Sequence, residues 1–294
     1  MKIVLTGSIG HISKPLAEEL VKKGHTVTII SSNPEKKSSI ESLGAIAAIG
    51  QVTDSNFLAS VFQEADAAYL MIPPNYAAPD PVAYYRSVGD SYAEAIRQSG
   101  LKKAVNLSSY GAHVPKGTGF ITGSYEVEQI LSALPDVSIT FVRPTYFYYN
   151  LNNFIQVIKA TGAIAANYGG PDKIVLVAPA DIATVVAEEL TSAASGHKVR
   201  YICSDERTGN EIASVLGKEI GLPNLKWNIL TDEQMLENLT GRGVPKHVAE
   251  NLVELGAALR TGLLSGDYEL HKPVLSNTKL ETFAKEFAKT YHQS

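Results

Sequence analysis

The chain has 294 residues, of which 45% are hydrophobic and 19% are charged, and its formal net charge is −4. This composition predicts a globular protein with a substantial core. The acidic balance and the lack of a long basic run argue against nucleic acid or an anionic membrane as a partner. The single cysteine, Cys203, excludes an intramolecular disulfide framework; it lies in an apolar run and is expected to be a buried structural thiol.

Short apolar runs alternate with amphipathic segments along the first half of the chain. The apolar runs predict strands at 2–6, 25–30, 45–49, 67–72, 104–108 and 138–142. The segments between them predict helices up to about residue 23 and at 39–43, 54–64, 81–98 and 125–134, with Asp54 as an N-cap and Gly100 as a stop. Repeated βα units predict a doubly wound parallel α/β sheet of the Rossmann type. A ligand is then expected beyond the carboxyl ends of the strands, where the strand order reverses.

The C-terminal part of the chain is less regular. It predicts helices at 209–220, 231–239, 246–259 and 283–291 and a short strand at 226–229. We expect residues 1–150 to form a dinucleotide-binding domain, with contributions from about 175–205. Residues 151–294 are expected to form a smaller, mostly helical lobe that covers the substrate. Asp181 is expected to be an N-cap that orders a loop.

Two kinds of segment are not expected. The first strand begins at residue 2, and no apolar run reaches roughly 18 residues, so the sequence predicts neither a signal peptide nor a membrane span. The cytoplasm is therefore the expected location. No spacing of His, Cys and acidic residues predicts a metal site.

The turn after the first strand carries the most informative motif, Gly7-Ser8-Ile9-Gly10-His11-Ile12-Ser13. Gly7 suits a sharp turn, and Gly10 lets a phosphate approach the backbone. The helix that follows presents unpaired N–H groups and its positive dipole end to that phosphate. Ser13 replaces the third glycine of the usual fingerprint and is small enough for close packing of helix and strand. The alternative interpretation is an ordinary βα turn without a ligand.

The end of the second strand is where a dinucleotide-binding protein selects its cofactor. It has no early acidic residue and reads Ser31-Ser32-Asn33-Pro34-Glu35-Lys36. Hydroxyl, amide and ammonium donors suit a 2′-phosphate, so the sequence favours NADP(H) over NAD(H). The alternative is that these residues only form and cap a turn.

Other strand ends supply further candidates for the same crevice. The residues expected to bind the cofactor are Gly7, Ser8, Ile9, Gly10, His11, Ile12, Ser31, Ser32, Asn33, Lys36, Gln51, Val52, Ile72, Pro73, Pro74, Ser108, Ser109, Pro144 and Tyr146. The candidate catalytic residues are Ser108, Tyr110 and Tyr146. For Ser109 and Tyr110 a simple role in the turn is the alternative.

Several motifs follow one another in a recognisable order. They are Thr6-Gly7-Ser8-Ile9-Gly10, Asn33-Pro34-Glu35-Lys36, Gly50 to Asp54, Ser108-Ser109-Tyr110-Gly111, Val127-Glu128, Arg143-Pro144 and Asp181 with its neighbours. In this order the chain resembles the NmrA-like, atypical short-chain dehydrogenase/reductase proteins from residue 1 to about 215. The resemblance implies a dinucleotide-binding domain with a small C-terminal lobe. It also implies either NADPH-dependent reduction, for example of quinones, or sensing of the cofactor's redox state without catalysis.

The chain departs from the pattern that this resemblance implies at three positions. The family often has Arg where Ser32 stands, as a reader of the 2′-phosphate. The wider superfamily uses a Tyr-x-x-x-Lys pair for acid catalysis, and the matching positions hold Phe120 and Ser124. Arg143 is expected to anchor a loop rather than to bind substrate.

A quinone can accept hydride without a tyrosine acid, because its oxyanion is stabilised electronically and the cofactor performs the difficult step. The aromatic residues of the run at 145–149 suit a flat, quinone-like substrate, although some of these rings are expected to pack in the core. The sequence therefore favours an NAD(P)H-dependent reductase of a quinone or a similar conjugated carbonyl. The alternative is a non-catalytic NADP(H)-binding regulator, and a homodimer is left open.

Overall fold

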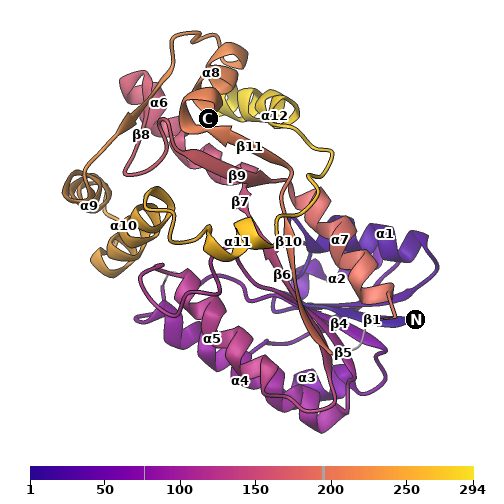
Figure 1. Ribbon diagram of the computed structural model, residues 1–294. Helices are drawn as coiled ribbons and strands as arrows, with labels where there is room; N and C mark the ends of the chain where they lie inside the picture. Colours follow the sequence, from indigo (N-terminus) through magenta and orange to yellow (C-terminus); the bar gives the residue numbers. More distant parts are fainter. Residues whose placement is uncertain (76, 194–195) are drawn as a thin grey trace. The chain divides into compact units, whose positions relative to one another are not determined.

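The computed structural model of the protein describes residues 1–75, 77–193 and 196–294 (Figure 1). The chain divides into two compact units. The first comprises Met1–Ala112, Gly123–Arg143 and Ile182–Arg200, and the second comprises His113–Thr122, Pro144–Asp181 and Tyr201–Ser294. Two residues of the predicted contribution at 175–205, 194 and 195, lie outside the described residues.

A seven-stranded sheet forms the centre of the first unit, with the strand order β10-β6-β5-β4-β1-β2-β3. Its strands are β1 (Lys2–Leu5), β2 (Thr26–Ser31), β3 (Ile46–Ile49), β4 (Ala67–Leu70), β5 (Lys103–Leu107), β6 (Ser138–Pro144) and β10 (His197–Ile202). All pairs among β1 to β6 are parallel. The strand order reverses at β1, which lies between β2 and β4, so the predicted doubly wound parallel sheet is confirmed.

Helices cover both faces of this sheet, with α3, α4 and α5 on one face and α1 and α7 on the other (Figure 1). The helices are α1 (Ser13–Lys22), α2 (Lys37–Glu41), α3 (Ser55–Phe62), α4 (Pro81–Ser99), α5 (Ile121–Ser132) and α7 (Pro179–Thr191), and a short 3-10 turn, η1, spans Pro34–Lys36. Phe62, Tyr92 and Leu131 from the first group pack with Val4 and Phe141 of the sheet in one buried cluster. Burial of this apolar surface is what holds the helices on the sheet.

Local signals set several helix ends where the sequence predicts them. The Asp54 carboxylate accepts a hydrogen bond from the Phe57 N–H (3.0 Å), and Gly100 ends α4 with a φ of +73°. The start of α5 differs, because the helix begins at Ile121 rather than at the predicted residue 125. Gly123 explains the difference: a Cβ there would lie 2.8 Å from the Tyr85 Cβ. Close packing against α4 therefore extends the helix through a residue of low helix propensity.

A buried carboxylate links β6, α7 and β10. Glu189 is 3% exposed, and its oxygens lie 2.6 Å from the Lys198 ammonium and 2.7 Å from the Arg200 guanidinium. The Thr140 hydroxyl donates a third bond of 3.1 Å. Burial alone would raise the pKa of Glu189, but the hydrogen bonds from Lys198, Arg200 and Thr140 outweigh it and hold the pKa below 4.5.

The Glu189→Gln variant is expected to lower the free energy of unfolding by about 2 kcal/mol at neutral pH, since bonds between charged groups are lost. A carboxylate with a lowered pKa stabilises the fold above its ordinary pKa, and this contribution is lost as the pH falls through the folded-state pKa. The difference between wild type and variant should thus be constant above roughly pH 5 and shrink below it. Urea unfolding across this pH range measures it, and a difference that grows toward acid pH contradicts the assignment.

The second unit contains two small sheets and several helices. One sheet has the order β11-β9-β7 and the other pairs β12 with β8. Its strands are β7 (Tyr146–Phe147), β8 (Ala163–Ala166), β9 (Lys173–Val177), β11 (Asp205–Thr208) and β12 (Lys226–Ile229). Its helices are η2 (Tyr148–Phe154), α6 (Ile155–Thr161), α8 (Gly209–Glu219), α9 (Asp232–Gly241), α10 (Lys246–Arg260), α11 (Gly266–Leu270) and α12 (Leu280–Gln293). These elements enclose a separate apolar cluster that includes Trp227 and Phe287.

Asp181 does not occupy the predicted N-cap. It lies inside the first turn of α7, because the helix begins two residues earlier, at Pro179, a residue favoured at the first helical position. Its carboxylate accepts hydrogen bonds from the Ser204 hydroxyl (2.6 Å) and from the Thr278 hydroxyl (3.1 Å) and N–H (3.3 Å). The residue therefore orders a loop, as predicted, from a different position.

Cys203 is fully buried, as expected. Its thiol lies 3.3 Å from the Asp205 carbonyl oxygen, and burial raises the pKa of the thiol. Among the described residues, no group of His, Cys, Asp and Glu side chains is arranged to hold a metal ion. The helices in the described part of the chain are all too short or too polar to cross a membrane.

Candidate functional site

The turn after β1 has a backbone that only glycine adopts easily. Gly7 has a φ of +88°, and a Cβ on it would lie 2.6 Å from the Met71 Cγ. The Thr6 hydroxyl accepts from the Met71 N–H (2.7 Å) and donates to the Met71 carbonyl (3.1 Å), which ties the ends of β1 and β4 together. The turn is therefore narrow and fixed at the point where the strand order reverses.

The helix that follows has an open N-terminus. No side chain caps α1 at Ile12 within the described chain, in contrast to α3 and α4, which Asp54 and Asp80 cap. Ser13 is 2% exposed and donates a 3.0 Å bond to the Thr6 carbonyl, so it serves helix–strand packing as predicted. First-turn N–H groups and a positive dipole end fit a dinucleotide diphosphate. The residues at this turn thus suit the predicted cofactor.

At the end of β2, the predicted selectivity residues fall into two groups. Ser31 is 3% exposed; its hydroxyl lies 3.0 Å from the Ser8 hydroxyl and also bonds Asn33. Asn33 caps η1 by accepting from the Glu35 N–H (2.9 Å). These two side chains shape the loop, whereas Ser32 and Lys36 are exposed and accessible to a 2′-phosphate.

The ends of β3 and β4 place the other unit-one candidates on the same edge of the sheet. Gln51 is exposed and Val52 is half-buried directly after β3. After β4, Ile72 is buried while Pro74 is exposed. Beneath them, the Tyr92 hydroxyl donates a 2.5 Å bond to the Met71 carbonyl. A hydrogen bond from a buried side chain therefore holds the segment after β4 in place.

At the end of β5, the Ser108 side chain is hydrogen-bonded to the buried ion pair of Glu128 and Arg143. The Ser108 hydroxyl donates to the Glu128 carboxylate. Arg143 binds that carboxylate through two nitrogens, with Nε 2.9 Å from Oε1 and Nη2 2.6 Å from Oε2. The neighbouring Ser109 hydroxyl donates to the Tyr110 carbonyl (3.2 Å), and Tyr110 is 8% exposed. Arg143 anchors this chain segment, as expected.

Pro144 and Tyr146 belong to the second unit. The Tyr146 hydroxyl lies 3.0 Å from the Tyr168 hydroxyl. Burial raises the pKa of Tyr168 to about 12 and raises the pKa of Tyr146 well above 10.0. Both phenols are therefore neutral at physiological pH. In the same run Tyr148 is a core residue: its ring stacks on Phe283 with centroids 5.3 Å apart.

Two residues at these sites were not predicted as site residues. Glu128 formed part of a recognised motif, but its bonds to Ser108 and Arg143 depend on three elements that meet only in the fold. Tyr168 follows a four-residue strand and belongs to no motif, so no sequence signal identified it.

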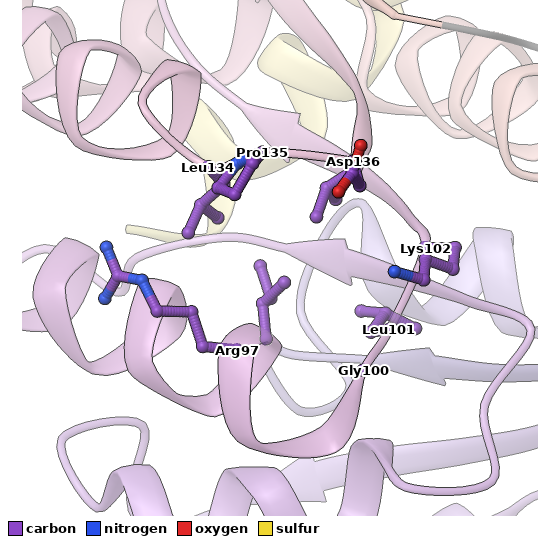
Figure 2. A pocket seen from close by; sticks show the side chains of 9 residues that line it. Arg97, Gly100, Leu101, Lys102, Leu134, Pro135 and Asp136 are labelled. Carbon is purple, nitrogen blue, oxygen red and sulfur yellow. The ribbon is translucent and has the colours of Figure 1, made fainter.

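A small cavity is lined by the end of α4 and by the residues that precede β5 and β6 (Figure 2). It measures about 220 Å³, and its lining includes Arg97 of α4, Lys102 and Asp136. Ligands of doubly wound sheets bind at the carboxyl ends of the strands, and this cavity lies at the amino ends of β5 and β6. It is separate from the candidate site.

Comparisons with known proteins agree with the observed fold. The NAD(P)H azoreductase of Xenophilus azovorans is 24% identical over 292 residues, covering 98% of this chain and 97% of that protein. The NADPH-dependent quinone oxidoreductase of Escherichia coli, solved with NADPH, has a TM-score of 0.82 at 20% identity, covering 97% of this chain and 99% of that one. The triphenylmethane reductase of a Citrobacter species has a TM-score of 0.83 at 21% identity, covering 98% and 100%. The model of the NmrA-like family matches residues 1–269. The chain belongs to the NmrA-like family.

Proposed function

We propose that this protein is an NAD(P)H-dependent oxidoreductase that transfers hydride to a quinone or a similar flat, conjugated acceptor. The observation that carries the proposal is the turn from Gly7 to the uncapped start of α1, at the reversal point of the sheet. In this proposal residues 1–150 bind the dinucleotide, and residues 151–294, together with aromatic side chains of the run at 146–149, supply the contacts to the substrate. NADP(H) is the preferred cofactor.

Each group of residues has a distinct task in binding. Gly7, Gly10 and the first turn of α1 hold the diphosphate through backbone N–H groups. Ser32 and Lys36 face solvent at the end of β2 and reach the 2′-phosphate. Ile72 and Pro73 present apolar surface next to the nicotinamide ribose, which limits water there.

The chemistry that NAD(P)H supplies when bound is hydride transfer, and the protein's residues orient it. Phe120 and Ser124 stand where a tyrosine acid and its lysine would be expected, so no residue pair lowers a phenol pKa there. Tyr146, one of the two phenol candidates, has a raised pKa and is a poor proton donor. An acceptor whose reduced form is a stabilised oxyanion, protonated by water, suits such a site.

The substrate class follows from chemistry and from the family. The names of the azoreductase, quinone oxidoreductase and triphenylmethane reductase given above all denote conjugated electron acceptors. The half-buried side chains of Tyr146, Phe147 and Tyr149 offer aromatic surface for such an acceptor. This supports quinones or dyes over saturated carbonyl compounds, which require an acid.

Steady-state oxidation of NADPH tests the proposal. The near-ultraviolet absorbance of NADPH is followed with menadione, an azo dye or a saturated ketone as the acceptor. The rate without protein is subtracted. Turnover with the conjugated acceptors and none with the ketone is expected. Binding of NADPH without turnover of any acceptor favours the redox-sensing regulator instead.

The Lys36→Ala variant is expected to weaken NADPH binding about fivefold to tenfold while leaving NADH binding unchanged, because an ammonium contact to the 2′-phosphate is lost. Lys22→Ala is the matched control, since Lys22 is an exposed lysine in the last turn of α1, at the far end of that helix from the turn. Fluorescence titration with both cofactors measures the ratio of dissociation constants. An unchanged ratio in Lys36→Ala contradicts the selectivity assignment.

A further inference from the structure

Near the end of β5, three buried side chains of the first unit are connected by hydrogen bonds. Ser108 follows β5, Glu128 lies on α5 and Arg143 lies on β6. The side chains of Arg143 and Glu128 are 7% and 6% exposed, and Ser108 is 7% exposed. A buried ion pair needs hydrogen bonds of good geometry to offset the cost of its desolvation. The Nε and Nη2 atoms of Arg143 each donate one such bond to the Glu128 carboxylate.

The direction of the Ser108 bond follows from the chemistry of its partner. A carboxylate has no proton to donate, so Ser108 must be the donor and Glu128 the acceptor. A hydroxyl has one proton and two lone pairs. With its proton committed to Glu128, the Ser108 oxygen offers a ligand only lone pairs.

The position of β5 in the sheet indicates which part of the cofactor would lie near Ser108. The diphosphate turn follows β1, and the selectivity loop follows β2 on one side. β5 lies two strands away on the other side, about 10 Å from β1 at ordinary strand spacing. The nicotinamide half of a dinucleotide extends in that direction when the adenosine half lies over β2.

We infer that Glu128, held by Arg143, positions Ser108 as a hydrogen-bond acceptor for a donor group of the nicotinamide half. The donor is a ribose hydroxyl or the carboxamide N–H. Ser108 then contributes to cofactor affinity and does not supply a proton or a hydrogen bond to the substrate oxygen. This inference rests on the proposed NAD(P)H-dependent function.

The Ser108→Ala variant tests the role of Ser108. It leaves Glu128 paired with Arg143, so it should fold. We expect the dissociation constant of NADPH, measured by fluorescence titration, to rise about tenfold, as for one lost hydrogen bond. Loss of a proton donor costs about 100-fold or more in kcat, so kcat with menadione at saturating cofactor distinguishes a proton donor from a group that only binds the cofactor. An unchanged dissociation constant, or a kcat that falls 100-fold, overturns the inference.

Glu128→Asp and its double variant with Ser108→Ala test positioning. Aspartate keeps the charge facing Arg143 but is one methylene shorter, so its contact with Ser108 is lost. The single variants should raise the NADPH dissociation constant to a similar extent, and the double variant should be no worse than either. Additive effects overturn the positioning role, because a purely structural residue would not act through Ser108.

Thr140→Val is the matched control. Thr140 also donates from a buried hydroxyl to a carboxylate held by cations, but it lies within β6, away from the cofactor edge. It should lose stability without a change in NADPH affinity. If the wild-type protein binds neither NADPH nor NADH, the proposed function fails. If it binds them and Ser108→Ala binds equally well, the inference alone fails.

Discussion

The Gly7→Ala variant is expected to bind NADPH about 100-fold more weakly than the wild type, a loss of about 3 kcal/mol. Two physical effects combine. A φ of +88° strains any residue with a Cβ, and that Cβ would lie 2.6 Å from Met71 Cγ and 3.1 Å from the Ser13 hydroxyl. The turn must shift, and the backbone N–H groups that we propose bind the diphosphate shift with it. Fluorescence titration with NADPH measures the loss.

Gly24→Ala is the control for this variant. Gly24 has a φ of +81°, and a Cβ at that position would meet no atom of the described residues within 4 Å. The backbone strain is thus similar, but there is no clash and Gly24 follows the far end of α1. It should lose stability by about 1–2 kcal/mol and retain its NADPH affinity. If both variants bind NADPH as the wild type does, the diphosphate site does not lie at this turn.

The Arg143→Met variant is expected to lower the free energy of unfolding by about 3–5 kcal/mol, because it leaves the Glu128 carboxylate buried without its cation. The side chains of this pair are 7% and 6% exposed. The double variant with Glu128→Met should recover most of the loss, since an apolar pair of similar volume needs no compensation. Chemical denaturation of the three proteins measures both values.

Arg86→Met provides the comparison for an exposed pair. Arg86 lies 3.3 Å from Glu126, and its side chain is 54% exposed. Solvent screens such a pair, so its loss should cost less than about 1 kcal/mol. Equal losses for Arg143→Met and Arg86→Met contradict the assignment of Arg143 as the anchor of the Ser108 cluster.

The parts of the fold with local signals could be predicted from sequence. The first strand, the glycine turn and α1 follow from consecutive residues, and Lys226–Ile229 forms the strand that its apolar alternation predicts. Asp54 and Gly100 act through their own side chain and backbone, so they end helices independently of the rest of the protein.

The parts that depend on distant contacts could not be predicted. β7 and β11 are two and four residues long, and each pairs with β9, which is distant in sequence from β7 and from β11. The early start of α5 depends on Gly123 meeting Tyr85 of another helix. Asp181 bonds Thr278, which is 97 residues away. No periodicity within a short window contains such information.

The features of the candidate site also fall into those that could and those that could not be predicted from sequence. Its glycines and strand-end residues could be placed from sequence because parallel strands deliver their carboxyl ends to one edge. The separate tasks of Ser31, which is buried and bonded, and Ser32, which is exposed, could not be distinguished, because neighbouring serines look alike in sequence. The donor role of Ser108 required its partner Glu128, which is 20 residues away.

A single-turnover experiment tests the central claim most directly. Protein saturated with one equivalent of NADPH is mixed without oxygen with excess menadione, and the fluorescence of reduced nicotinamide is followed. The proposed function predicts complete loss of the signal, faster than in protein-free solution, with one menadiol formed per NADPH. Bound NADPH that stays reduced, or decays no faster than free NADPH, contradicts a reductase.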